Sequence, residues 1–388
     1  MARSRLFVTC LSAFIVMLGV GIIVPLLPTF AEDLGASGLW IGIIFSAYSF
    51  SRLMFLPLAG KLSDIYGRKI IISVGLLLYA LVSIFYIFAQ TPEELSVVRL
   101  VHGTTSAMII PVAMAYTAEI SPEGLEGEFM GSFSRCLFLG MAFGPLLGGV
   151  ISEAVGIRYT FLSLSLMGFL TLILVIFAFP SEGTIKKRKI GLLKSLKNPS
   201  LRAAFIFRLL NSMGRGSVIS FLPLYLGIIG ISKFFIGLLI SINLFTSAFI
   251  QPGSGKLSDR VGPLYPVTIS TILGAILLYF LPRVDNFYVL VIFSILLGLT
   301  SALSIPAITA IIATEGKSRG GMGELMGAIS ASKSVGRIAG PVMSGIIYDL
   351  FGAGLTGLRA AFTVAAILAL SSSLIFWLGV RGVRKEVP

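Results

Sequence analysis

The chain has 388 residues, of which 56% are hydrophobic and only 12% are charged. A soluble protein of this length carries about twice that share of charged residues, so the composition excludes an ordinary soluble domain. The formal net charge of +13 would suit a nucleic-acid-binding protein, but the distribution of the basic residues argues against nucleic acid as a partner.

Apolar runs of 18 or more residues recur along the chain, and each is long enough to cross about 30 Å of hydrocarbon as a helix. The first run is too long for the core of a signal peptide and has no small-residue cleavage site, so we expect it to be a span. We predict twelve helical spans, at about residues 6–30, 39–60, 70–89, 95–117, 128–151, 159–179, 203–228, 234–252, 264–281, 287–313, 322–349 and 360–379.

The basic residues fix the expected orientation of these spans. If the N-terminus is cytoplasmic, most Lys and Arg residues lie in cytoplasmic segments, and the outer segments hold only Arg158, Lys233, Arg283 and Arg359. The positive-inside rule therefore predicts a multi-pass protein of the inner (plasma) membrane with both termini in the cytoplasm. Contact with the lipid bilayer, and not with nucleic acid, then explains the net charge.

The chain contains an internal repeat. The pentapeptide G-K-L-S-D occurs at residues 60–64 and again at residues 255–259, and the same shift of 195 aligns glycine and proline positions in several pairs of spans. Because each half holds six spans, both halves enter the membrane in the same direction. We expect an all-α membrane fold of two parallel-related six-helix bundles, residues 1–179 and 203–388, joined by a basic cytoplasmic linker at 180–202.

The loop between the second and third spans reads Gly60-Lys-Leu-Ser-Asp64-Ile-Tyr-Gly67-Arg68-Lys69. Gly60 would let another helix approach, Gly67 would allow a tight turn, and Asp64 could face the positive end of a helix. A plain cytoplasmic turn with orienting charges is the alternative. The second copy keeps Gly255 and Asp259 but replaces the basic pair with Pro263-Leu264.

Two further patterns lie within spans. In the fourth span, Arg99 and His102 are three residues apart and share a helix face. In the fifth, Gly140, Gly144 and Gly148 repeat every four residues beside Pro145 and Gly149, a pattern that favours close helix packing.

With the loop, these patterns make the chain similar to the major facilitator superfamily, and most similar to its twelve-span drug:proton antiporters. The resemblance implies that the loop latches the two halves in the outward-open state, more weakly in its second copy. It also implies that Arg99 takes part in proton or substrate coupling and that the glycine pattern marks exporters. His102 stands where the family more often has glutamine, and Arg99 could instead snorkel towards the outer surface. A near copy of the glycine pattern in the eleventh span shows that part of this signal is packing.

Basic residues also fall inside the predicted spans, whereas no acid lies near the middle of one. A charge at the bilayer centre costs about 3 kcal/mol on insertion scales, so these side chains should face a wet cavity or a partner. We expect the substrate and coupling cavity to include Arg52, Arg99, His102, Arg208, Asn211, Arg215 and Lys333. Cavity arginines suit an anionic group, although several could bind backbone carbonyls instead.

We predict a secondary active transporter that exports small amphipathic compounds, coupled to protons, by alternating access. The sequence leaves open export or exchange of an anionic metabolite or lipid, and a non-transporting membrane sensor on the same fold. His102 is the one side chain whose ordinary pKa suits coupling near neutral pH, and Glu32, Asp33 and Glu153 are other candidates. No cluster resembles an enzyme's catalytic or metal site. We therefore expect no cofactor and no metal, and a monomer whose partners are its small-molecule substrate, protons and lipid.

Overall fold

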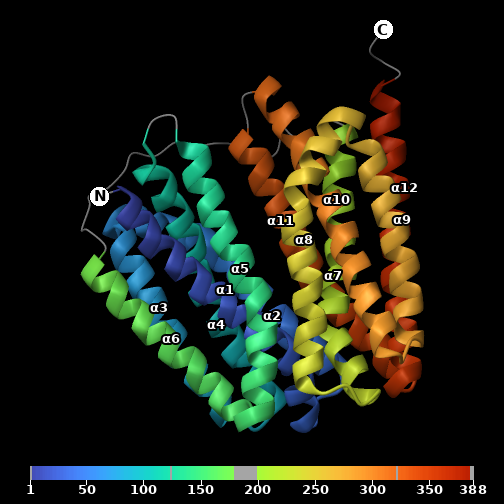
Figure 1. Ribbon diagram of the computed structural model, residues 1–388, viewed down its shortest axis with the longest axis horizontal. Coiled ribbons are helices and arrows are strands. Elements are labelled where there is room, and N and C mark those ends of the chain that lie inside the picture. Colours follow the sequence, from blue (N-terminus) through green and yellow to red (C-terminus); the bar gives the residue numbers. More distant parts are fainter. Residues whose placement is uncertain (1, 123–124, 179–198, 320–321, 385–388) are drawn as a thin grey trace. The chain divides into compact units, whose positions relative to one another are not determined.

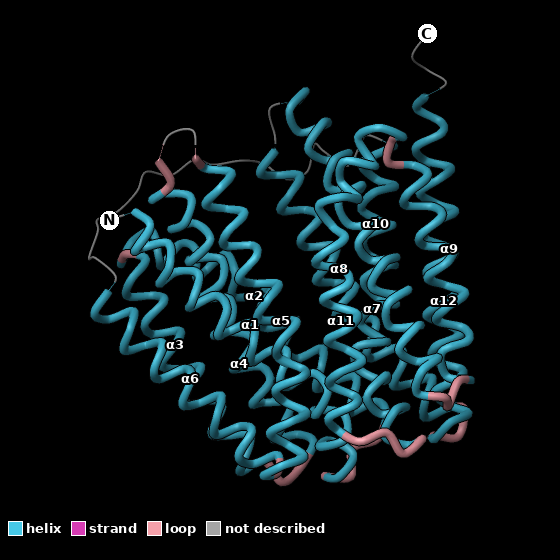
Figure 2. Tube along the Cα trace, in the orientation of Figure 1, coloured by secondary structure: helices cyan, strands magenta, loops and turns pink. Residues whose placement is uncertain are grey.

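The computed structural model describes residues 2–122, 125–178, 199–319 and 322–384, and the structural statements below concern these ranges. Most of the predicted linker, residues 180–198, lies outside them, and residues 199–202 already form the start of α7. Figure 2 shows helices joined by short loops. The helices are α1 (Ala2–Asp33), α2 (Gly38–Tyr66), α3 (Arg68–Phe88), α4 (Pro92–Ile120), α5 (Glu126–Val155), α6 (Ile157–Ala178), α7 (Pro199–Ile228), α8 (Lys233–Val261), α9 (Leu264–Phe280), the 3-10 turn η2 (Leu281–Arg283), α10 (Phe287–Arg319), α11 (Met322–Leu350) and α12 (Gly354–Arg384).

Local sequence signals explain where several helices begin. At the start of α4 the Thr91 side chain accepts a hydrogen bond from the Glu94 N–H at 3.3 Å, and the Glu94 carboxylate accepts one from the Gln90 N–H at 2.8 Å. Between α2 and α3 the connection is the single residue Gly67, whose φ of +93° favours glycine. Gly262, with φ of +80°, takes the corresponding place between α8 and α9.

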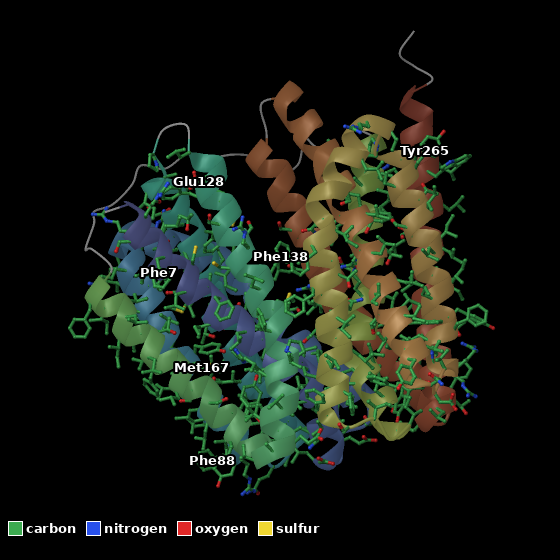
Figure 3. The ribbon with its side chains drawn as sticks, in the orientation of Figure 1. Phe7, Phe88, Glu128, Phe138, Met167 and Tyr265 are labelled. Carbon is green, nitrogen blue, oxygen red and sulfur yellow. The ribbon has the colours of Figure 1, made fainter. Side chains whose placement is uncertain are left out.

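The helices have the length and composition of membrane spans. Within the described ranges, 10 helices are long and apolar enough to cross a membrane, and α7 and α11, which carry intramembrane basic residues, are not among them. Large apolar side chains cover the outside: Phe88 is 65% exposed and Tyr265 is 59% exposed, and Figure 3 shows both at the periphery of their helices. This is the arrangement expected of helices that face hydrocarbon.

Contacts between residues group the chain into two compact units. Unit 1 comprises Met1–Ala36, Ile43–Lys187 and Gly230–Ser241, and unit 2 comprises Ser37–Gly42, Arg188–Ile229 and Ile242–Pro388. In unit 1, α1 packs on α5 and α3 packs on α6 (Figure 1). In unit 2 the corresponding pairs, α7 with α11 and α9 with α12, pack in the same way.

The internal repeat extends to individual contacts. Gly140 and Gly144 of α5 lie against the backbone carbonyls of Phe14 and Leu18 in α1. The equivalent glycines of α11, Gly336 and Gly340, lie against the carbonyls of Leu209 and Met213 in α7, which are 195 residues further along than Phe14 and Leu18. A methyl group at any of these glycines would collide with backbone, so both units depend on glycine for the close packing of this helix pair.

Each unit has its own apolar core. In unit 1 the core joins α1, α3, α4 and α5 through fully buried side chains such as Val16, Leu76 and Phe133. In unit 2 one cluster joins α7, α9 and α12 through Phe207, Val267 and Phe376. The polar side chains described next are therefore held by tightly packed surroundings.

Candidate functional site

Unit 1 contains a buried polar cluster, the His102 cluster, made of Tyr48 on α2, Tyr79 and Tyr86 on α3, and Arg99 and His102 on α4. Arg99 and His102 lie one turn apart on the face of α4 that points into the unit, and they are 4% and 0% exposed. α2 comes close enough to contribute because Gly103, the next residue of α4, lies against the carbonyl of Tyr48.

Tyr86 is the centre of the hydrogen bonds in the His102 cluster. Its hydroxyl lies 2.8 Å from His102 Nδ1 and accepts a bond from Arg99 Nη1 at 3.5 Å. Arg99 can only donate to this hydroxyl, so the Tyr86 hydrogen remains available for a bond to Nδ1. Nε2 has no hydrogen-bond partner among the described residues, and the three tyrosine rings surround the imidazole at centroid distances of 5.1 to 5.7 Å.

The Arg99 guanidinium is held without an acid. Its Nε donates to the Ile44 carbonyl at 3.4 Å, and its Cζ lies 4.6 Å from the centre of the Tyr48 ring and 5.8 Å from that of Phe45. No carboxylate pairs with it in the part of the chain that the structure describes. Aromatic faces and backbone dipoles therefore stabilise this buried charge. Arg99 points into the bundle and does not snorkel towards the surface.

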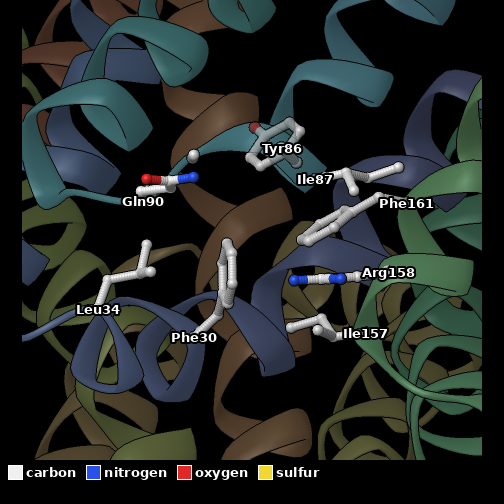
Figure 4. A pocket seen from close by; sticks show the side chains of 9 residues that line it. Phe30, Leu34, Tyr86, Ile87, Gln90, Ile157, Arg158 and Phe161 are labelled. Atoms are coloured by element: carbon white, nitrogen blue, oxygen red, sulfur yellow. The ribbon is translucent and has the colours of Figure 1, made fainter.

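A small pocket lies beside the His102 cluster, between the end of α1, the end of α3 and the start of α6 (Figure 4). Its volume is about 220 Å³, and its lining includes Phe30, Leu34, Gln90, Arg158 and Phe161. Tyr86 also lines it, with its ring stacked on Phe161 at 4.7 Å, so one residue borders both the pocket and the cluster.

Unit 2 holds a second group of cations, on the helix pair α7 and α11. Arg208, Asn211 and Arg215 follow one another on one face of α7 and are partly buried, as are Lys333 and Arg337 on α11. Arg215 lies within electrostatic range of both Arg208 and Arg337. Lys333 and Arg337 interact with neighbouring residues. Arg208 and Arg215 have no hydrogen bond or ion pair to any described residue, and Arg208 Nε is buried without a partner.

The repeat shows that packing alone does not require these charges. The equivalent helix pair of unit 1, α1 and α5, is apolar at the same places: Ala13, Val16, Val20, Leu137 and Met141 stand where unit 2 has Arg208, Asn211, Arg215, Lys333 and Arg337. Two helix pairs with one backbone plan therefore differ in charge.

The predicted gating loop forms a charged network within unit 1. Arg68 contacts Asp64 at 2.7 Å and Glu119, near the end of α4, at 2.8 Å, so the loop is tied to a third helix. Lys69 is partly buried. No described heavy atom lies within 4 Å of a methyl group placed on Gly60, so the helix approach expected there stays a prediction. Gly255 and Asp259 lie near the end of α8, and their side-chain surroundings are not described.

The glycine pattern of α5 faces two helices. Gly148, like Gly140 and Gly144, lies against α1, at the backbone of Ile22. Gly149 instead lies against the Lys233 carbonyl at the start of α8, and the Pro145 carbonyl lies against Gly237 of the same helix.

Two further arginines lie within predicted spans. Arg52 on α2 is partly buried with no bonded partner among the described residues, and Arg135 on α5 is exposed.

Sequence reasoning identified Arg99 and His102 together, and Arg208 with Arg215, but it missed their surroundings. Tyr48, Tyr79 and Tyr86 come from other helices, and Glu119 lies 51 residues from Arg68. Most of the predicted spans carry several aromatic residues, so nothing in the sequence distinguishes these three tyrosines. In the described ranges no group of three or more His, Cys, Asp and Glu residues could hold a metal ion.

Comparison with known proteins identifies the family. The Major Facilitator Superfamily pattern matches residues 9–207 and again residues 204–388. This chain belongs to the major facilitator superfamily. It is therefore a multi-pass membrane transporter of small molecules and not an enzyme.

The relatives cover nearly the whole chain. It is 30% identical to an uncharacterized MFS-type transporter of Methanocaldococcus jannaschii over 97% of this chain and 98% of that one. It is 27% identical to the multidrug resistance protein MdtG of Proteus mirabilis over 98% of this chain and 96% of that one. Among solved structures, a bacterial homolog of the human lysosomal transporter Spinster, inward-facing and unoccupied, has a TM-score of 0.86 at 14% identity and covers 99% of this chain and 98% of that one, which shows the shared fold.

Proposed function

We propose that this transporter is a proton-coupled exporter of small amphipathic compounds that works by alternating access. Its likeness to multidrug resistance proteins supports this proposal, because it extends over nearly the whole length of both chains. We also propose that the protein is a monomer of the inner membrane with both termini in the cytoplasm. The basic residues in the predicted cytoplasmic segments support this orientation.

A second candidate, export or exchange of an anionic metabolite or lipid, is favoured by unit 2. Arg208 and Arg215 are two partly buried guanidinium groups with no bonded partner among the described residues. The equivalent positions in unit 1 are Ala13 and Val20, so the cost of placing charge here is not explained by packing. Guanidinium groups bind carboxylate and phosphate with two parallel hydrogen bonds. An amphipathic compound that carries a negatively charged group would be a substrate under both candidate functions.

Transport into proteoliposomes under an imposed pH gradient separates these candidates. Matched anionic, neutral and cationic amphipathic compounds would be compared for the native protein and for Arg215→Gln and Arg208→Gln. Removing a charge-assisted bond of about 1.5–3 kcal/mol should raise the KM for anionic compounds by about 10- to 100-fold and leave neutral compounds unaffected.

The control for this experiment is Arg135→Gln, which removes an exposed arginine of α5 and should change neither class of compound. If Arg215→Gln and Arg208→Gln left transport of every anionic compound unaltered, the anionic candidate would be wrong and export of neutral or cationic compounds would remain. If no compound moved in response to the pH gradient, proton coupling would be wrong.

We propose His102 as the first candidate for the coupling group. It is the only histidine of the chain and lies beside Arg99 in a cluster of described residues without a carboxylate. A His102→Gln variant should still bind substrate but lose the dependence of transport on the pH gradient. Retention of that dependence would remove His102 from the mechanism.

A further inference from the structure

Two carboxylates near the ends of α5 and α11 bind the first N–H groups of other helices. Asp349 Oδ1 accepts a hydrogen bond from the Gly38 N–H at 2.7 Å, and Asp349 Oδ2 accepts one from the Leu39 N–H at 2.8 Å. Glu153 Oε2 accepts a hydrogen bond from the Phe234 N–H at 2.9 Å. Gly38 and Leu39 begin α2, and Phe234 is the second residue of α8. The first N–H groups of a helix have no partner within it and lie at its positive end, so a carboxylate is a strong ligand for them.

The two contacts are equivalent under the internal repeat. Leu39 and Phe234 are 195 residues apart, the shift that aligns α2 with α8. Glu153 and Asp349 are 196 residues apart, the shift that relates Gly140 and Gly144 of α5 to Gly336 and Gly340 of α11. Glutamate in one copy and aspartate in the other reach the same kind of partner. Both halves of the chain thus keep a carboxylate at this place although its side-chain length differs.

Close glycine contacts accompany each carboxylate and obey the same repeat. Gly345 lies against the Gly38 carbonyl and Gly42 against the Pro341 carbonyl. In the other copy, Gly149 lies against the Lys233 carbonyl and Gly237 against the Pro145 carbonyl. We name the two contact regions, residues 38–42 with 341–349 and residues 233–237 with 145–153, the end clasps.

The end clasps lie where two helices pass from one unit to the other. Residues Ser37–Gly42 belong to unit 2, whereas α2 continues in unit 1 from Ile43. Residues Gly230–Ser241 belong to unit 1, whereas α8 continues in unit 2 from Ile242. A movement of one unit relative to the other must therefore bend α2 and α8 at these places or open the end clasps.

We propose that Glu153 and Asp349 are gating residues of the transport cycle. Each holds the first turn of α8 or α2 in the arrangement seen here, and the cycle releases both when it reaches its alternate state. The proposal rests on alternating access, the mechanism proposed above. The carboxylates and the glycines contribute differently to each end clasp. The hydrogen bonds of the carboxylates add directional attraction, whereas the glycines allow the two backbones to approach closely.

Distances between spin labels test the proposal without any substrate. In a background in which the free cysteines Cys10 and Cys136 are replaced by Ser, one pair of labels would be placed at Leu39 and Leu350, and another at Val155 and Phe235. All four side chains are exposed, at 37%, 76%, 55% and 42%, and the backbone N–H of Leu39 is unchanged by a cysteine there. Asp349→Asn should raise the population with a long 39–350 distance about 10-fold, Glu153→Gln should do the same for 155–235, and the double variant should exceed either.

Conservative and control variants make the outcome specific. Asp349→Glu and Glu153→Asp should keep the native distances, because the repeat already uses both side-chain lengths. Asp285→Asn removes another exposed acid, one in the loop before α10, and should leave both distances unchanged. Unfolding midpoints in detergent should stay close to native for all of these variants.

The proposal is wrong if Asp349→Asn and Glu153→Gln leave both distance distributions unchanged. It is also wrong if they lower the unfolding midpoint without changing the distances, since the carboxylates would then be structural only, or if Asp285→Asn has the same effect on the distances. These outcomes do not depend on which compound is exported. Failure of the flux experiment above would overturn the export proposal and leave the distance result to be judged by itself.

Discussion

Replacing Tyr86 by Phe removes one oxygen from the His102 cluster and tests whether hydrogen bonds hold that cluster together. The hydroxyl lies 2.8 Å from His102 Nδ1 and 3.5 Å from Arg99 Nη1, and the Tyr86 side chain is fully buried. In the variant, Nδ1 loses its partner in an imidazole whose Nε2 already has none among the described residues. A buried polar group without a partner costs about 1–3 kcal/mol, whereas interhelical hydrogen bonds in membranes average about 0.6 kcal/mol. We expect Tyr86→Phe to reduce the free energy of unfolding by about 1–2 kcal/mol.

Tyr79→Phe is the matched control for this prediction. Tyr79 borders the same imidazole at a centroid distance of 5.1 Å and is equally buried, but its hydroxyl has no hydrogen-bond partner among the described residues. Its removal deletes an unsatisfied polar atom, so the free energy of unfolding should change by less than about 0.5 kcal/mol or increase. Tyr48→Phe should resemble Tyr86→Phe, because the Tyr48 hydroxyl donates to Ser106 Oγ at 2.8 Å.

The measurement is unfolding of the purified protein in mixed detergent micelles as SDS is added, followed by circular dichroism. Equal losses for Tyr79→Phe and Tyr86→Phe would refute the reasoning, because stability would then depend on the volume that each hydroxyl fills and not on its partner. A Tyr86→Phe variant as stable as the native protein would show that the hydrogen bonds to His102 and Arg99 contribute nothing measurable.

The remaining predictions concern packing and surface charge. Gly144→Leu should abolish folded protein in fluorescence-detected size-exclusion chromatography, because its Cβ would lie 2.5 Å from the Leu18 carbonyl oxygen and 2.6 Å from the Gly21 Cα. Gly131→Ala on the same helix meets no described atom within 4 Å and should leave the yield unchanged or raise it, since Ala favours a helix by about 1 kcal/mol over Gly. Glu119→Gln should lower the free energy of unfolding by about 0.5–1 kcal/mol, less at high salt, because Glu119 accepts hydrogen bonds from Arg68 Nε at 3.1 Å and Nη2 at 2.8 Å. Glu128→Gln, whose partner Arg3 lies 3.8 Å away on the exposed surface, should leave the unfolding midpoint unchanged at either salt concentration.

The fold could be predicted because its signals are local or periodic. Apolar runs fix the helices, and the glycine and proline positions repeat at a nearly constant shift, so the duplicated backbone plan is readable from the sequence alone. The tyrosines around His102 could not be predicted, because they come from α2 and α3, whose rotation relative to α4 is set by packing. The end clasps did leave a signal: Glu153 and Asp349 align under the shift of 196, but two acids among 17 are noticed only once their partners are known.

Some features of the molecule occur in both units, and others occur in one unit only. Features shared by both units are contacts with backbone groups or backbone turns: glycines against carbonyls, turns at a glycine with positive φ, and the end clasps. Features present in one unit only concern charge. Arg99 and His102 of α4 correspond to Ser294 and Leu297 of α10, and Arg208 and Arg215 of α7 correspond to Ala13 and Val20 of α1. Movement that exchanges two equivalent states needs equivalent parts in both units, whereas recognition of one compound and of a proton does not. On this argument we propose that the shared contacts serve the movement, and that the unshared cations serve the choice of substrate and its coupling.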